Sequence, residues 1–241
     1  MFAVVKKELR QYFSGLLGYM TIAVFLLLTG LVLFVLPESG ILDLGYATMD
    51  SFFSSAPYVM LILIPGITMK SFSEEYKAGT FEVLRTAPLK VSDLVWGKFF
   101  ACLLVVLIAL LLTLVYVYSL VQLSTEGIDT GGILGSYIGL FFLCAVYAAI
   151  GIYTSSLQKN AITAFMSSVL ICYVVFSVFS SLATIDALST GAGYYLSLLG
   201  IEHHYQNISK GYIDTRDVVY FITVIVLFLK LTSLRIKNHK P

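Results

Sequence analysis

Charged residues are scarce in this sequence, and their scarcity excludes most classes of soluble protein. Only 12% of the 241 residues are charged, whereas a soluble domain carries roughly 25%. Hydrophobic residues make up 59% of the chain, and the mean hydropathy is +0.91. The net charge of +1 provides no basic excess that would suggest a nucleic-acid partner. The composition therefore indicates an integral membrane protein that works in the lipid bilayer.

Motifs for catalysis and for cofactor binding are also missing. The three cysteines, Cys102, Cys144 and Cys172, fall inside apolar runs without CxxC or Cys/His spacing, so we interpret them as packing residues. No HExxH or GxSG motif is present, and Gly97 and Lys98 lack the upstream glycine of a phosphate-binding loop. We therefore expect a chain that is not an enzyme and holds no cofactor or metal, with ATP bound on a separate chain.

Six apolar segments approach the length of roughly 20 residues that a helix needs to cross a bilayer. They cover residues 15–36, 52–69, 97–123, 133–157, 161–183 and 218–235. Pro57 and Pro65 are expected to kink the second segment or to delay its start. Lys230 in the sixth is interpreted as an anchor that reaches the headgroups, with a functional intramembrane charge as the alternative. The predicted fold is an all-α integral membrane protein, with one transmembrane domain over residues 1–241.

The distribution of basic residues predicts the orientation of these spans. Six spans place both termini on one side, and 13 of the 15 Lys and Arg residues fall on that side. They are Lys6, Lys7, Arg10, Lys70, Lys77, Arg85, Lys90, Lys98, Lys159, Lys230, Arg235, Lys237 and Lys240. Basic residues favour the cytoplasmic side of a membrane. We therefore expect both termini and the loop of residues 70–96 in the cytoplasm.

The loop of residues 70–96 carries signals for helices. Ser71 and Glu74 fit a capping box at the start of one helix, and Gly79 supplies a stop. Thr80 can cap a second short helix, which Pro88 closes. That helix would expose an amphipathic surface made of Phe81, Glu82, Val83, Leu84 and Arg85. Spacing alone leaves two interpretations open, a docking surface for a soluble partner and a solvated connector on the membrane.

Two stretches of the sequence carry recognisable patterns. The first is S-F-S-x-E-x-x-x-G-T-x-E-x-L-x-x-x-P followed later by G-K; it runs from Ser71 to Lys98, after a basic amphipathic start, VVKKELRQYF. It resembles the membrane subunits of ABC-2 type transporters. The second, IEHHYQNISKGYIDTRDVVYF at residues 201–221, is similar to the stretch before the last span of gliding-motility-associated ABC permeases. With the length and the span count, the resemblance covers the whole chain.

The resemblance implies a type V exporter-like arrangement in which residues 71–88 form a coupling helix seated in a groove of an ABC ATPase. The positions implied in this contact are Glu74, Glu75, Gly79, Thr80, Phe81, Glu82, Leu84, Arg85 and Pro88. An interfacial helix over residues 4–13 would flank the contact with Lys6, Lys7, Glu8 and Arg10. Further implied partners are a second copy or a related permease, and a membrane subunit with a large extracytoplasmic domain. The implied location is a bacterial inner membrane.

Residues 184–217 are too long for an ordinary hairpin connection, and their apolar stretch is too short to span a membrane. We expect short helices here that dip into the outer leaflet. Glu202, His203 and His204 are adjacent, but neighbouring side chains on a helix point in different directions. A structural turn is therefore favoured over a metal site.

Small residues recur along the fourth span. They include Gly131, Gly135, Gly139 and Gly151. Such residues let helices approach closely in lipid, where packing drives association. We favour packing within this subunit over a seam between two subunits.

The function expected from the resemblance is the permease subunit of an ATP-driven ABC-2 transporter, an exporter linked to gliding motility or cell-surface assembly. No span carries a buried acidic or basic relay, which argues against an ion-coupled carrier. The scarcity of polar positions in the spans favours a lipid-linked or amphiphilic cargo. The alternative is an ATP-driven mechanical or regulatory complex that acts on a periplasmic partner without transporting a cargo.

Overall fold

The computed structural model describes residues 1–36, 48–81, 90–124, 128–183, 198–209, 211 and 214–238. These residues form helices joined by turns, without a strand among them. Six helical segments are long and apolar enough to cross a membrane. They are Leu16–Phe34, Asp50–Lys77, Val91–Leu123, Thr130–Leu157, Ala161–Ala183 and Thr215–Asn238. The prediction of an all-α membrane protein with six spans is confirmed.

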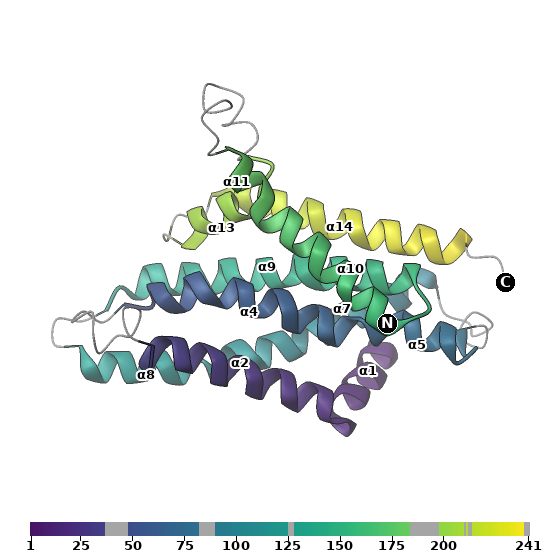
Figure 1. Cartoon of the computed structure of the whole chain (residues 1–241), viewed down its shortest axis with the longest axis horizontal. Helices are drawn as coiled ribbons and strands as arrows, with labels where there is room; N and C mark the ends of the chain where they lie inside the picture. Colours follow the sequence, from purple (N-terminus) through teal and green to yellow (C-terminus); the bar gives the residue numbers. More distant parts are fainter. Residues whose placement is uncertain are drawn as a thin grey trace.

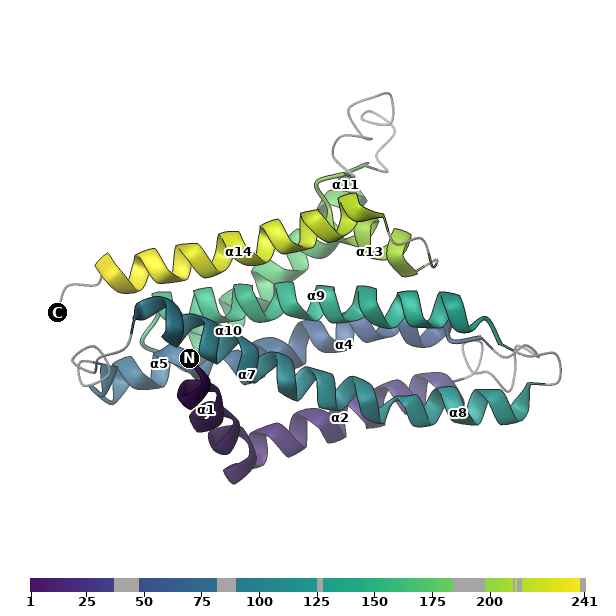
Figure 2. The ribbon, with the colours of Figure 1, turned by 180° about the vertical axis from the view of Figure 1, so that it is seen from behind.

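The long helices run along one axis, and the N-terminus lies at the same end of the bundle as the end of the last helix (Figure 1). We call this the terminus end, and the other the opposite end. The helices are α2 (Leu16–Phe34), α4 (Asp50–Thr68), α7 (Val91–Leu112), α8 (Leu114–Leu123), α9 (Thr130–Leu157) and α14 (Thr215–Asn238). Helix α10 (Ala161–Tyr173) crosses them obliquely (Figure 1). At the terminus end, α1 (Phe2–Ser14) lies at a steep angle to α2 (Figure 2). Residues 4–13, expected to form an interfacial helix, lie within α1.

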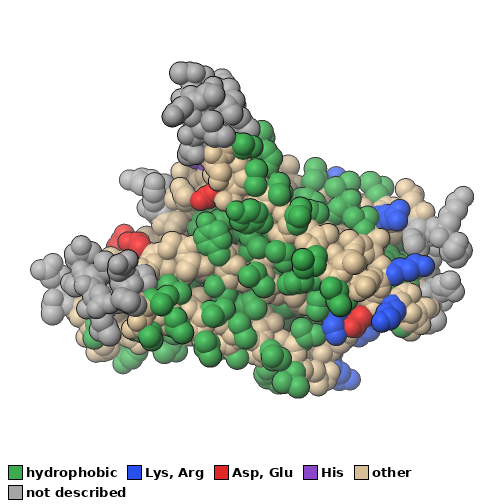
Figure 3. Space-filling model, viewed as in Figure 1, with side chains coloured by type: hydrophobic (Ala, Val, Ile, Leu, Met, Phe, Trp, Pro, Cys, Tyr) green, Lys and Arg blue, Asp and Glu red, His purple; other side chains and the backbone are tan. Residues whose placement is uncertain are grey.

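Charge is segregated along the bundle axis. Lys and Arg side chains gather at the terminus end, and apolar side chains cover the middle of the bundle (Figure 3). Arg216, in the first turn of α14, is a basic residue at the opposite end. The two ends of the bundle therefore differ in charge, as the sequence predicts.

Helix α9 is the centre of the bundle. Of its most apolar stretch, 67% is buried, against 28% for α2 and 28% for α14. Two of its glycines face the helix α13 (Ile201–Ser209): a Cβ on Gly139 would lie 3.0 Å from Ile208 Cγ2, and one on Gly135 would lie 3.1 Å from the Ile208 carbonyl oxygen. A Cβ on Gly151 would overlap the Thr68 hydroxyl of α4. These three glycines pack inside the subunit.

Gly131 behaves differently from the other three glycines of the fourth span. Among the described residues, a Cβ at this position would meet the Asp129 carboxylate, 3.5 Å away, and Asp129 is the N-cap of the same helix. Within the part of the chain that the structure describes, Gly131 therefore makes no close contact with another helix, unlike the other three glycines.

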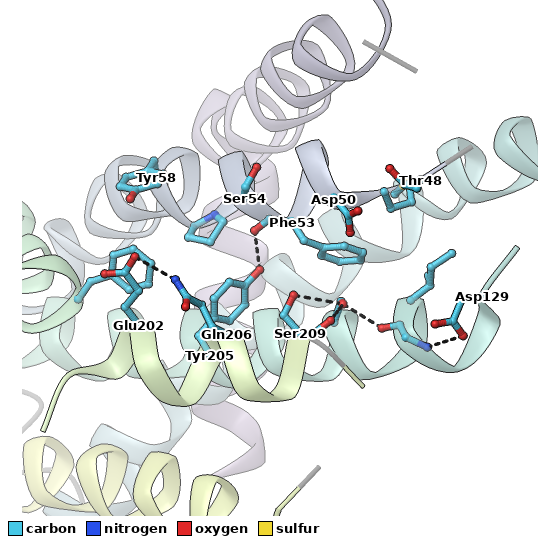
Figure 4. A pocket seen from close by; sticks show the side chains of 16 residues that line it. Thr48, Asp50, Phe53, Ser54, Tyr58, Asp129, Glu202, Tyr205, Gln206 and Ser209 are labelled. Carbon is cyan, nitrogen blue, oxygen red and sulfur yellow. Dashed lines mark hydrogen bonds between the residues drawn. The ribbon is translucent and has the colours of Figure 1, made fainter. Parts of the chain in front are cut away.

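Both prolines of the second span lie inside α4, which begins at Asp50. Pro57 has no N–H, so the carbonyl oxygen of Phe53, four residues earlier, loses its donor within the helix. The Tyr205 hydroxyl donates a hydrogen bond to this oxygen at 2.7 Å (Figure 4). Burial raises the pKa of the Tyr205 phenol, which keeps its proton available for this bond. The proline therefore creates an attachment point for α13 on α4.

Two helix breaks carry no clear sequence signal. The third span changes from α7 to α8 at Thr113, whose hydroxyl donates to the Leu110 carbonyl oxygen at 2.6 Å and lies 2.9 Å from the Tyr137 hydroxyl. The fifth span contains a π-helical turn, η1 (Val174–Val178), between α10 and α11 (Phe179–Ala183). Such turns inside α-helices are rare and occur often at functional sites.

His204 on α13 has a structural role. Its Nδ1 lies 2.6 Å from Asp217 Oδ1, and its Nε2 lies 2.8 Å from the carbonyl oxygen of Leu198. The imidazole also stacks on Tyr220, with 4.0 Å between the ring centroids. Both ring nitrogens are engaged, and no group of three metal-ligating side chains occurs within the described ranges. Because Glu202, His203 and His204 lie inside the helix α13, the expectation of a turn is wrong, and His204 instead attaches α13 to α14.

Candidate functional site

A buried group of charges joins three segments at the terminus end. Lys98, near the start of α7, is 1% exposed, and its Nζ lies 2.9 Å from Glu8 Oε1 on α1. The same Nζ lies 2.9 Å from Glu75 Oε1 on α5 (Lys70–Lys77) and donates to the Ser71 carbonyl oxygen at 2.6 Å. We call Lys98, Glu8 and Glu75 the ion cluster. It connects the expected interfacial helix to the expected coupling segment.

Gly97 explains how α1 comes so close to α7. A Cβ at Gly97 would lie 2.7 Å from the Cβ of Val4, so α1 packs directly against the α7 backbone. Glu8 follows Val4 by one helical turn and therefore lies on the same face of α1. This face brings the Glu8 carboxylate to the Lys98 ammonium. Gly97 and Lys98, the Gly-Lys pair of the sequence pattern, are thus the residues on which α1 packs against the third span.

The pairing within the ion cluster balances the cost of burying its charges. Burying an isolated ion costs several kcal/mol of solvation free energy. Only close opposite charges and hydrogen bonds can offset this cost. Two carboxylates here share one ammonium, and the Lys7 ammonium lies 3.4 Å from Glu75 Oε1. The Phe72 ring adds a cation–π contact, with its centroid 4.9 Å from Lys98 Nζ. Because the Lys7 side chain is 54% exposed, its pair contributes little.

A serine of α9 holds the junction between α4 and α5. The Ser155 hydroxyl accepts hydrogen bonds from the backbone N–H groups of Phe72 at 3.0 Å and Ser73 at 3.2 Å. It donates to the Met69 carbonyl oxygen at 2.8 Å. α5 therefore continues the second span, and its cap comes from another helix.

The predicted capping box at Ser71 and Glu74 is wrong. Ser71 is the second residue of α5, and its hydroxyl has no hydrogen-bond partner among the described residues. The residue before α5 is Met69, which is itself helical. The helix has no free start for a box to cap, because it follows directly from α4.

Replacing Ser155 with alanine is expected to destabilise the α4–α5 junction by about 1–3 kcal/mol, because three buried hydrogen bonds are lost. A lower unfolding midpoint of the purified chain in detergent would show this loss. Ser156→Ala is the matched control, because the Ser156 hydroxyl is buried but donates only to Tyr153 in its own helix. Equal midpoints for the two variants would contradict the proposed role of Ser155.

The other residues expected in the coupling contact are placed as follows. Gly79 has φ +68° and ends the turn after α5, as its sequence position predicts. Glu74 pairs with Lys70 one turn earlier at 2.9 Å on the surface, and the Thr80 hydroxyl donates to the Glu75 carbonyl oxygen at 3.5 Å. Glu82, Leu84, Arg85 and Pro88 lie outside the described residues. Lys6 and Arg10 are exposed on α1.

Phe81 differs from its expected place on an exposed amphipathic surface. It is 5% exposed, and its ring centroid lies 4.6 Å from that of Tyr76 on α5. The left-handed turn at Gly79 reverses the chain, which brings the Phe81 ring back onto α5. Phe81 therefore fixes the segment after α5, and the expectation of an exposed Phe81 is wrong.

A cavity of about 240 Å³ lies beside the ion cluster. Its lining comes from α1, α5 and their neighbours: Lys7, Glu8, Gln11, Tyr12, Ile67, Lys70, Ser71, Glu74, Glu75, Ala78, Thr80 and Lys98. Burial raises the pKa of the Tyr12 phenol well above its ordinary value, so this side chain stays neutral. The cluster and the cavity together form a joint between α1, α5 and α7.

Comparison with known proteins identifies the family. Residues 44–232 match the family model described as ABC-2 family transporter protein, which is more than half of the chain. No curated protein matches the chain. The match contains Glu75, Lys98 and Ser155, while α1 with Glu8 precedes it. Together with its six membrane-spanning helices, the match shows that this chain belongs to the ABC-2 transporter family and is a multi-pass membrane permease subunit.

Proposed function

We propose that this chain is the transmembrane subunit of an ATP-driven ABC-2 transporter and that α5, with the segment after it, docks on the ATPase. The ion cluster carries this proposal, because Lys98 ties α5 to both α1 and α7 with close charged contacts. Membership of the family implies association with an ABC ATPase and a partner permease. The membrane subunit itself is a non-catalytic component of such a transporter.

The proposed coupling follows from how α5 is connected. A displacement of α5 by the ATPase acts on α4 directly, because the two helices are joined at Met69. The same displacement acts on α7 and α1 through Lys98, and on α9 through Ser155. Four helices of the terminus end, α1, α4, α7 and α9, are thus coupled to one short helix.

The orientation belongs to the same proposal. The excess of basic side chains at the terminus end favours a cytoplasmic location for both termini, in a bacterial inner membrane. We further propose two six-span halves, a second subunit with a large extracytoplasmic domain, and export of an amphiphilic cargo linked to gliding motility or cell-surface assembly. The resemblance described for the loop and for residues 201–221 supports this assignment.

A mechanical function without cargo is the second candidate, and one contact favours it. Tyr205 bonds α13 to the Phe53 carbonyl oxygen at the opposite end of α4. A displacement of α4 that begins at α5 would therefore reach the opposite end of the bundle. There it could act on a periplasmic partner through residues 184–217.

The test of the coupling proposal is purification of the full chain from its native membrane, with its partners identified by mass spectrometry. We expect a P-loop ATPase to accompany the chain, and Gly79→Ala to reduce its recovery several-fold. An alanine at φ +68° costs roughly 1–2 kcal/mol, which would change how the chain leaves α5.

Gly66→Ala is the control for Gly79→Ala, because a Cβ at Gly66 meets no atom within 4 Å. The control variant should keep the ATPase. Recovery of the folded chain alone, or equal recovery of the ATPase with both variants, would refute the docking role of α5.

A further inference from the structure

A second cavity lies at the opposite end of the bundle, far from the ion cluster. Its volume is about 660 Å³, within the range of roughly 300–1,000 Å³ typical of small-molecule sites. Its walls come from α4, the start of α9, η1 and α13 (Figure 4). Segments distant in the sequence therefore build one hollow that no coupling role explains.

Aromatic rings line part of this cavity. Phe176, from the π-helical turn, lies with its ring centroid 5.6 Å from that of Tyr58 on α4, and the two planes stand at 89°. The Tyr205 ring of α13 lies 6.4 Å from the Phe176 ring. Phe53 also lines the cavity. The faces and edges of these rings offer an apolar surface that is suited to cation–π contacts.

The charge of the cavity has one sign. Asp50 on α4, Asp129 before α9 and Glu202 on α13 line it, and none of the described lining residues is a Lys, Arg or His. No ion pair joins these three carboxylates to another described residue, in contrast to the paired carboxylates of the ion cluster. Carboxylates in a hollow with apolar walls concentrate a potential that attracts cations.

Three hydrogen-bond donors in the lining are already used within the protein. The Tyr205 hydroxyl donates to the Phe53 carbonyl oxygen, and the Ser136 hydroxyl donates to the carbonyl oxygens of Gly132 and Ser209. The Gln206 amide donates to Glu202 Oε1 at 3.3 Å. Among the described lining residues, the Thr48 and Tyr58 hydroxyls remain as donors, whereas the three carboxylates add only acceptor oxygens. The wall therefore suits an ammonium group better than an anionic ligand.

We propose that this cavity binds an organic cation, an ammonium group carried on an apolar body, between the aromatic rings and the carboxylates of Asp50 and Glu202. The ammonium can belong to the headgroup of an amine-bearing phospholipid or to a free amphiphilic amine. Either ligand places its charge near the carboxylates and its apolar part against the rings. This inference concerns a ligand of the permease itself and does not depend on the coupling to an ATPase.

The test uses two probes of the same shape and opposite charge, tetraphenylphosphonium and tetraphenylborate. Equilibrium dialysis with the purified full chain in an uncharged detergent measures the binding of each probe. We expect saturable binding of tetraphenylphosphonium that the double variant Asp50→Asn, Glu202→Gln weakens at least tenfold. Tetraphenylborate is expected to bind no more to the wild type than to this variant.

Asp214→Asn is the control, because Asp214 is an exposed carboxylate near the start of α14 that does not line the cavity. This variant should bind tetraphenylphosphonium like the wild type. Unfolding midpoints of all variants establish that the chains compared are folded. Equal binding of tetraphenylphosphonium to the wild type and the double variant would overturn the proposal, as would tighter binding of tetraphenylborate.

A competition experiment distinguishes the two sources of the ammonium group. Nanodiscs that contain phosphatidylethanolamine should displace the probe, relative to nanodiscs of phosphatidylglycerol, if the ligand is a lipid headgroup. Displacement by decyltrimethylammonium without an effect of the lipid would assign a free amphiphilic amine. Failure of both competitors against a bound probe would overturn the assignment of the ligand class. The ATPase is absent from these measurements, so their failure would leave the coupling proposal standing.

Discussion

Replacing Lys98 with methionine is expected to destabilise the chain strongly, by about 3–5 kcal/mol, since removal of one partner leaves buried charges uncompensated. The Lys98 ammonium is the common partner of Glu8 and Glu75, which lie in different helices. Methionine has a similar length but no charge, so both carboxylates would lose their closest cation and keep only the exposed Lys7 ammonium nearby. A lower unfolding midpoint and a several-fold lower yield of monodisperse protein would measure this effect.

Two comparisons separate the loss of charge pairing from a general packing defect. Lys7→Met removes an exposed ammonium that lies 3.4 Å from Glu75 Oε1, and such a pair contributes about 0–1 kcal/mol. The triple variant Lys98→Met, Glu8→Gln, Glu75→Gln removes the stranded charges and should recover part of the lost midpoint. If Lys98→Met lowered the unfolding midpoint no more than Lys7→Met does, the ion cluster would not hold α1, α5 and α7 together.

Replacing Gly151 with alanine is expected to have the second large effect. The added Cβ would overlap the Thr68 hydroxyl oxygen and lie 2.9 Å from the Thr68 Cβ. Thr68 is fully buried, and its hydroxyl donates to the Ile64 carbonyl oxygen at 2.9 Å, so it cannot move aside easily. Overpacking of a tight contact costs typically about 1–3 kcal/mol. A lower midpoint of thermal unfolding in detergent would measure this destabilisation. Recovery of the ATPase with the purified variant would show whether the assembly is affected as well.

The contact itself supplies the control for Gly151→Ala. Adding Thr68→Ala removes the hydroxyl but keeps the Thr68 Cβ 2.9 Å from the added methyl group, so it should restore only part of the midpoint. Gly66→Ala, also on α4, adds a methyl group where a Cβ has no neighbour within 4 Å. The close approach of α4 and α9 would be disproved if Gly66→Ala and Gly151→Ala were equally stable.

The features that the sequence predicted are those encoded over short distances in the chain. The six spans depend on the length of apolar runs, and the charge difference between the two ends depends on a count of Lys and Arg. Gly79 was expected to end a helix because few other residues adopt a positive φ, and its φ is +68°. Local composition therefore predicted the architecture and this turn.

The partners of each functional residue could not be predicted in the same way. Lys98 belongs to the recognised pattern, yet Glu8 precedes it by 90 residues and pairs with it only through packing of α1 on Gly97. Ser155 caps α5 from 83 residues away. Ser71 matched a capping box, but the helix through Met69 left no free N-terminus to cap. Tertiary contacts replaced the local signals at each of these positions.

Pro57 is an intermediate case. Its missing N–H shows from the sequence alone that the Phe53 carbonyl oxygen lacks its helical donor. The identity of the new donor, Tyr205, depends on how α13 packs against α9 and reaches α4. A proline thus predicts the existence of a contact without predicting the partner.

The position of the ion cluster along the chain has a consequence for biogenesis. Glu8, Glu75 and Lys98 all occur within the first 98 residues, so the joint is complete once the start of the third span has been synthesised. Ser155 and Gly151 arrive on the ribosome later, with the fourth span. The first 98 residues can therefore assemble as an early folding unit in the membrane. The fourth span then packs against an ion cluster that has already formed.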